Sequence, residues 1–192
     1  MKKSIYVTIF DQNGNKIKEV DFFKCIEKLI KFRKLVSDQN FLNLPEYRLS
    51  FTVDDDNLKY FFESAERRRP SNELMENITC FNIYDFYQLS VEFEYQDFEE
   101  EIENYIEHHS LSAADCRALS DFHSLDQSFY DQFISLHIDS ILENHSKYLD
   151  RIPSSRLYTI FSQSNFTNMI NLCEYLLHRY EIHSNSNEEI DL

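Results

Sequence analysis

Only one glycine, Gly14, occurs among the 192 residues of the chain. The P-loop, the dinucleotide-binding fingerprint and the kinase loop bring backbone amides close to a phosphate, and each of them needs several glycines. The nucleophile elbow of serine hydrolases also relies on glycine around its serine. The sequence therefore excludes these nucleotide-binding and hydrolytic motifs.

The charge of the chain argues against nucleic acid as a partner. The chain has 19 Lys and Arg against 34 Asp and Glu, a net charge of -15. Residues 1–36 carry a balance of +5, whereas residues 37–192 carry -20 and would repel a phosphate backbone. With 17 Phe and 12 Tyr, the chain nevertheless has enough apolar side chains to fill a core.

The cysteines and the hydropathy pattern predict an intracellular protein. No apolar run approaches the roughly 20 residues that span a bilayer, and no apolar stretch suited to a signal peptide follows the first residues. We expect the cytoplasm, with the nucleus as the alternative, and no membrane partner. No two cysteines have the CxxC spacing, so we expect the four cysteines to be small buried side chains in a reducing compartment. The cysteines are Cys25, Cys80, Cys116 and Cys173.

The first 66 residues combine strand and helix patterns. Residues 5–10 and 16–20 flank Asn13-Gly14 and predict a β-hairpin with a primed turn at the glycine. From Asp21, which is placed to cap a helix, apolar residues recur with helical spacing to about Val36. Residues 47–53 alternate as a strand, and the three aspartates at 54–56, followed by Asn57, cap a helix that reaches about Glu66.

Three charged clusters are candidate contact surfaces for a protein partner. Two are basic, and the third belongs to a predicted helix pair over residues 78–108, in which residues 92–107 carry eight acidic side chains and no basic one. The commoner explanation of such clusters is a solvated surface. The candidate residues are Lys24, Lys28 and Lys31 on one helix face, Arg67, Arg68 and Arg69 in a loop, and Glu99, Glu100 and Glu103 on the acidic helix.

The chain from residue 110 onward predicts helices only. Ser112 and Asp115 have the spacing of a capping box, and apolar residues recur with helical spacing from Asp126 to about Tyr148. Pro153 suits the first turn of a helix over residues 154–162. The last helix begins near Met169, and residues 183–192 form a polar tail.

The residues that carry chemistry in other proteins do not form a recognised pattern here. His137 and His145 lie about 12 Å apart along a helix and cannot share a metal. The spacing of His108, His109, Cys116 and His123 matches no zinc site. A nucleophilic pair of Cys116 with His123 is only a formal alternative. We therefore expect no catalytic residue, no metal and no cofactor, and not an enzyme.

The order of these elements resembles a BTB/POZ domain followed by a BACK-type helical region. The best-matching stretch begins with Glu76-Asn77-Ile78, continues with Tyr84, Leu89 and Phe93, and ends with Phe98, Ile102 and Tyr105-Ile106. Downstream, residues 148–153 and 157–161 resemble the step in BACK regions where a short helix follows leucine and then proline or serine. The resemblance implies an α+β fold, with a small N-terminal sheet of a hairpin plus a further strand and with helices. It divides the chain into a BTB/POZ-like domain over residues 1–110 and a BACK-like helical region over residues 111–192 with a polar tail.

The resemblance implies a protein–protein interaction module that acts by binding, as a scaffold or tether and as the N-terminal part of a longer repeat-containing protein. The alternative is a substrate adaptor of a cullin-type ubiquitin ligase. The hydrophobic-x-Glu element of cullin contact is not evident around residues 67–73, and this favours the scaffold. The helix and strand that many BTB homodimers exchange do not precede the first strand, so we expect a monomer or a weak homodimer. A second alternative is an acidic mimic that occupies a basic surface.

Overall fold

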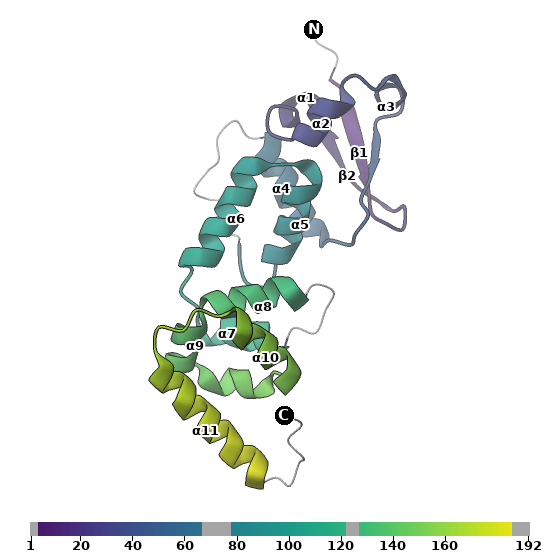
Figure 1. Ribbon diagram of the computed structural model, residues 1–192. Helices are drawn as coiled ribbons and strands as arrows, with labels where there is room; N and C mark the ends of the chain where they lie inside the picture. Colours follow the sequence, from purple (N-terminus) through teal and green to yellow (C-terminus); the bar gives the residue numbers. More distant parts are fainter. Residues whose placement is uncertain (1–3, 67–77, 122–126, 186–192) are drawn as a thin grey trace. The chain divides into compact units, whose positions relative to one another are not determined.

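The computed structural model describes residues 4–66, 78–121 and 127–185 (Figure 1). It confirms the α+β class, with a small mixed sheet and many helices. The chain divides into two compact units, Met1–Ile106 and Glu107–Leu192. The assignment of these parts to BTB/POZ-like and BACK-like domains, with a boundary at residue 110, stays a prediction.

The sheet of unit 1 has three strands in the order β2-β1-β3. These are β1 (Tyr6–Phe10), β2 (Lys16–Asp21) and β3 (Glu46–Arg48). β1 pairs antiparallel with β2, where Val7 lies opposite Val20, and parallel with β3, where Ile9 lies opposite Tyr47. Val7, Ile9 and Val20 are fully buried, so this face of the sheet contributes to the core.

The hairpin is confirmed, but its turn is not the primed turn that Asn-Gly predicts. The Asp11 amide donates to the Asn15 carbonyl at 2.9 Å, and the Gly14 amide donates to the Asp11 carbonyl at 3.1 Å. Among the described residues only Gly14 and Glu94 have positive φ, and Gly14 has φ 85°. A type I′ turn needs positive φ at both of its central residues, and of the residues in this turn only Gly14 has it. The two strands are therefore joined by a three-residue loop, residues 12–14, with the left-handed Gly14 at its end.

The helix predicted from Asp21 is interrupted. It forms α1 (Phe22–Cys25) and α2 (Ile30–Leu35), and α3 (Gln39–Asn43) follows. The Asp21 carboxylate accepts the Phe23 and Lys24 amides, which confirms the cap. Ten residues of continuous helix would separate Phe22 from Phe32 by about 15 Å. Their ring centroids lie 5.5 Å apart, and the break in front of Ile30 allows this contact.

The strand predicted over residues 47–53 is shorter than expected. β3 ends at Arg48, which lies opposite Phe10, the last residue of β1. Beyond this point β1 offers no further pairing, and the Leu49 amide makes the last contact by donating to the Phe10 carbonyl. Leu49 and Val53 are nevertheless buried, so these two apolar positions of the predicted alternation do contribute to the core.

Three longer helices follow: α4 (Asp55–Glu66), α5 (Ile83–Phe93) and α6 (Gln96–His108), the last of which ends two residues beyond the unit 1 boundary. The Asp54 carboxylate accepts the amides of Asp56 and Asn57, as the capping role predicts. The helix pair over 78–108 is confirmed, although α5 begins only at Ile83. The sequence predicts the turn between the two helices near Tyr95-Gln96-Asp97, and the structure places it at Glu94, just before that stretch. Tyr95 is buried against Phe61 and Phe98.

The regular elements in the described part of unit 2 are all helices. Its elements are α7 (Ala113–Asp121), α8 (Gln127–Leu136), α9 (Ile138–Asn144), the 3-10 helix η2 (Ser146–Arg151), α10 (Ser154–Gln163) and α11 (Met169–Asn185). Ser112 and Asp115 form the predicted capping box. The single helix predicted from Asp126 to Tyr148 is wrong, because the chain bends at His137 and His145. These bends let α8 pack on α10 while α9 packs on α11.

A buried ion pair joins two helices of unit 2. The Arg156 Nε of α10 donates to the Asp131 Oδ1 of α8 at 2.6 Å, and both side chains are almost fully buried. Pro153 precedes α10 as its N-cap. α11 continues to Asn185, so the predicted polar tail begins later than residue 183, and residues 186–192 lie outside the described part. No described helix has the length and apolar character needed to cross a bilayer.

The left-handed turn gives a direct test of the hairpin. We expect Gly14→Ala to lower the free energy of unfolding by about 1–2 kcal/mol, because an L side chain is strained at this φ. Gly14→Asn should lose less, since asparagine tolerates the left-handed region better. The matched control is Asn13→Ala, at an exposed neighbour without positive φ. Urea denaturation measures all three, and equal midpoints for the two alanine variants would contradict the assigned turn.

Candidate functional site

The three candidate lysines do not share one helix face. Lys24 belongs to α1, Lys28 lies between α1 and α2, and Lys31 belongs to α2. The expected continuous stripe is therefore wrong, because the helix that would carry it breaks before Ile30. Their role as partner contacts stays a prediction.

Each of these lysines has its own contacts within unit 1. Lys24 lies 4.0 Å from the Asp21 carboxylate, and Lys31 lies 3.9 Å from Glu92. Lys28 is half-buried: its Nζ donates to the Ser64 carbonyl at 3.2 Å and lies over the Tyr95 ring. Desolvation lowers the pKa of the Lys28 ammonium below its usual value. Lys28 thus helps to hold α4 beside the turn between α5 and α6.

The candidate residues Arg67, Arg68 and Arg69 lie outside the described residues. Their role as a contact surface remains as the sequence predicts it.

The acidic candidates lie along α6 with a clear division between its two sides. Phe98, Ile102 and Tyr105 are buried, and Phe98 packs edge-to-face on Phe61 and Phe86. Glu100 and Glu103 are exposed, and Glu99 is half-buried. The apolar side therefore secures the helix, and the carboxylates face solvent.

The carboxylates of α6 differ from their neighbours in having no counter-ion. Within the described ranges, no Lys, Arg or His forms an ion pair with Glu99, Glu100 or Glu103. In the preceding turn, Glu94 accepts the Lys34 ammonium at 2.7 Å. Glu92 lies near Lys31 and accepts the Tyr47 hydroxyl, whose pKa is raised by burial and by this carboxylate. Charge is thus balanced at the end of α5 and unbalanced along α6.

Like charges at helical neighbours have a cost. Glu99 and Glu103 are four residues apart and Glu100 and Glu103 are three apart, so each pair destabilises the helix by about 0.2–0.5 kcal/mol. The packing of the buried side outweighs this repulsion. A positively charged partner would remove it, which makes this surface the best candidate for a contact with another molecule.

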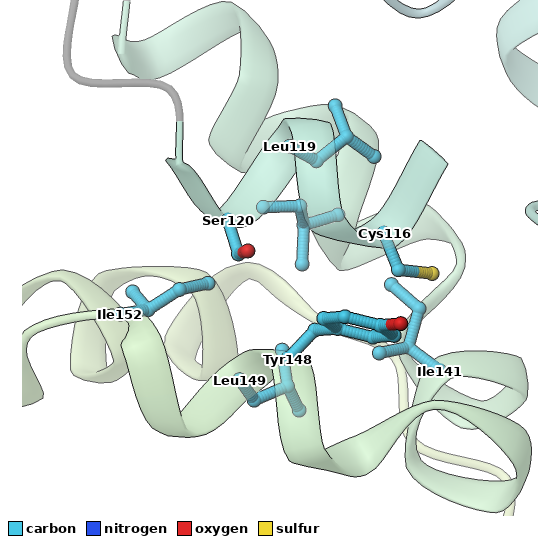
Figure 2. A pocket seen from close by; sticks show the side chains of 8 residues that line it. Cys116, Leu119, Ser120, Ile141, Tyr148, Leu149 and Ile152 are labelled. Atoms are coloured by element: carbon cyan, nitrogen blue, oxygen red, sulfur yellow. The ribbon is translucent and has the colours of Figure 1, made fainter. Parts of the chain in front are cut away.

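A small pocket lies within unit 2 (Figure 2). Its volume is about 10 Å³, roughly the space of one water molecule. Figure 2 shows Cys116, Leu119 and Ser120 of α7 facing Tyr148 and Leu149 of η2 across it. Most of its lining is aliphatic, and the Ser120 hydroxyl donates to the Arg117 carbonyl. The pocket is a small gap in the packing between α7 and η2, and its volume is too small to hold a substrate.

Burial disfavours the thiolate form of the cysteine in this pocket. Burial raises the pKa of Cys116 to about 11, so the thiol stays protonated. The other member of the formal pair, His123, lies outside the described residues. Burial and nearby carboxylates also raise the pKa of Cys25. Cys25, Cys80 and Cys116 are buried as expected, whereas Cys173 on α11 is exposed, against the prediction.

A serine, an aspartate and a histidine of unit 2 lie close together, and the serine and the aspartate have a structural role. The Asp115 Oδ2 accepts the Ser112 amide at 2.9 Å and the Ser112 hydroxyl at 2.7 Å, and it lies 3.4 Å from the His109 Nε2. The Asp115 amide donates back to the Ser112 hydroxyl oxygen. These bonds start α7 in the way that a capping box does. The Ser112 oxygen is therefore committed to the helix end.

Comparison with known proteins adds no family. Neither the protein-family models nor the curated proteins give a match to this chain.

The burial of the cysteines predicts a single accessible thiol. At neutral pH we expect a thiol reagent to label Cys173 rapidly and the other three only on unfolding, because those three are buried. Cys173→Ser should remove the rapid phase, and Cys116→Ser should leave it unchanged. Mass spectrometry of the labelled chain gives the position. Rapid labelling of native Cys116 would contradict both its burial and its raised pKa.

Proposed function

We propose that this chain is a non-catalytic protein–protein interaction module, a scaffold or tether whose α6 presents an acidic docking surface to a basic partner. The observation that carries this proposal is the set of carboxylates Glu99, Glu100 and Glu103, which face solvent without an ion-pair partner among the described residues. Their helix is held firmly by Phe98 and Ile102. A rigid element that carries unbalanced charge is well suited to electrostatic docking.

The element order supports the same class of function. A hairpin, short helices, a further strand and a helix pair precede an all-helical unit, as in the BTB/POZ and BACK regions that the sequence resembles. We propose this family assignment together with the function, because both rest on that order.

Binding to a basic peptide at increasing salt tests the docking surface. A fluorescent Lys- and Arg-rich peptide, followed by anisotropy, should bind the full chain at low salt and lose affinity steeply as salt screens the charges. The double variant Glu100→Gln, Glu103→Gln should bind the peptide severalfold more weakly, because it replaces two exposed carboxylates of α6 with neutral amides.

The matched control is Glu143→Gln with Glu181→Gln. Both residues are exposed in unit 2, and the double substitution changes the net charge by the same amount. If the two double variants lose equal affinity, the peptide responds to the net charge of -15 and the assignment to α6 is wrong.

The ligase-adaptor alternative has a separate test. A purified cullin N-terminal domain mixed with the full chain should form no complex in gel filtration if the chain is a scaffold. A stable complex that survives high salt would replace the scaffold proposal with the adaptor.

A further inference from the structure

Helix α11 uses one side to attach to its own unit. Leu172 and Tyr175 are buried, and the Tyr175 ring packs edge-to-face on Phe161. The Arg179 guanidinium donates to the Leu149 carbonyl at 3.1 Å and to the Ile152 carbonyl at 3.0 Å. These bonds satisfy carbonyls at the end of η2, so α11 is fixed in orientation on unit 2.

A second side of α11 is apolar and exposed. The exposed fractions are 57% for Met169, 68% for Ile170, 46% for Leu176, 65% for Leu177 and 63% for Tyr180. Cys173 is exposed among them. On a helical projection these side chains cover about 120°, next to the attached side, and no charged residue falls within that arc.

The spacing on this second side is that of a helix–helix seam. Met169, Cys173, Leu176 and Tyr180 are separated by four, three and four residues, the a/d spacing of a heptad. One flank of the seam is apolar, with Ile170 and Leu177 seven residues apart. The other flank carries Leu172 and Arg179, which already contact unit 2. The pattern indicates another helix as the occupant.

We propose that the occupant is α11 of a second copy of this chain, packed antiparallel around a two-fold axis. In an antiparallel pair, the flank with Ile170 and Leu177 meets the same flank of the other helix. In a parallel pair it would meet the flank with Leu172 and Arg179, which the partner's own unit 2 occupies. The one-sided apolar flank is therefore self-complementary only in the antiparallel arrangement.

The area is sufficient for a reversible dimer. If the exposed part of the seam and its apolar flank were covered completely, on the order of 600 Å² would be buried per copy, or about 1,200 Å² in total, the lower limit for specific interfaces. An uncharged centre formed by leucine, isoleucine, methionine and tyrosine has the composition of such an interface. The dimer goes beyond the acidic surface of α6 and does not depend on it.

Sedimentation equilibrium of the full chain tests the dimer. We expect reversible association with twice the mass of one chain, and Leu177→Glu should raise the dissociation constant roughly tenfold or more. The control is Tyr158→Glu on α10, another exposed large side chain, which should leave association unchanged. Circular dichroism and the urea midpoint establish that both variants are folded.

Crosslinking tests the direction of the helices. In the antiparallel seam Cys173 lies opposite Leu176 of the other copy, so Leu176→Cys should give an oxidised dimer in which Cys173 is linked to the introduced thiol. Peptide mapping identifies this link. A dimer linked only between equivalent positions would overturn the antiparallel arrangement.

Two further outcomes would overturn the proposal as a whole. A chain that stays monomeric at every concentration shows that α11 has another occupant or none. A dimer that Leu177→Glu leaves intact shows that the copies associate through another surface.

Discussion

The ring of Phe93 is the contact on which the core of unit 1 depends. It lies at the last residue of α5, and its centroid is 5.5 Å from Phe32 of α2, 5.1 Å from Tyr47 of β3 and 5.1 Å from Phe62 of α4. All three pairs are edge-to-face or tilted, and such arrangements stabilise aromatic rings beyond the burial of their area. Four elements, α2, β3, α4 and α5, therefore meet at one side chain. Through Phe93, α5 packs against β3 of the sheet.

This aromatic core explains how an acidic helix remains stable. α6 attaches to the same cluster through Phe98, which contacts Phe61 and Phe86. The attachment tolerates repulsion among the carboxylates of Glu99, Glu100 and Glu103. Burial also keeps the Cys25 and Cys116 thiols protonated, since it raises their pKa. These two thiols are thus buried and protonated, whereas Glu100 and Glu103 of α6 are exposed to solvent.

In unit 2, helix α11 has one side attached to the rest of the unit and a second side exposed. Arg179 and Tyr175 fix α11 to η2 and α10, and this leaves the arc from Leu176 through Met169 to Ile170 uncovered. Periodicity in the sequence places Met169, Leu172, Leu176 and Tyr180 together as apolar, because each recurs with helical spacing. Periodicity does not distinguish the apolar residues of α11 that pack against unit 2, such as Leu172, from those that remain exposed, such as Leu176. The exposure of Cys173 was missed for this reason.

The sequence by itself determined the α+β class, the hairpin and the starts of several helices. Asn13-Gly14 marked the hairpin, Asp21 and Asp54 marked helix starts, Ser112 and Asp115 marked α7, and the acidic run marked α6, because caps and turns are local interactions. Only the tertiary structure decided the breaks at Leu29 and His137, the early end of β3, and which charges are paired. Phe22 contacts Phe32, β3 ends where its partner β1 ends, and Lys31 of α2 lies 3.9 Å from Glu92 of α5. These are contacts between distant residues, and no spacing along the chain specifies them.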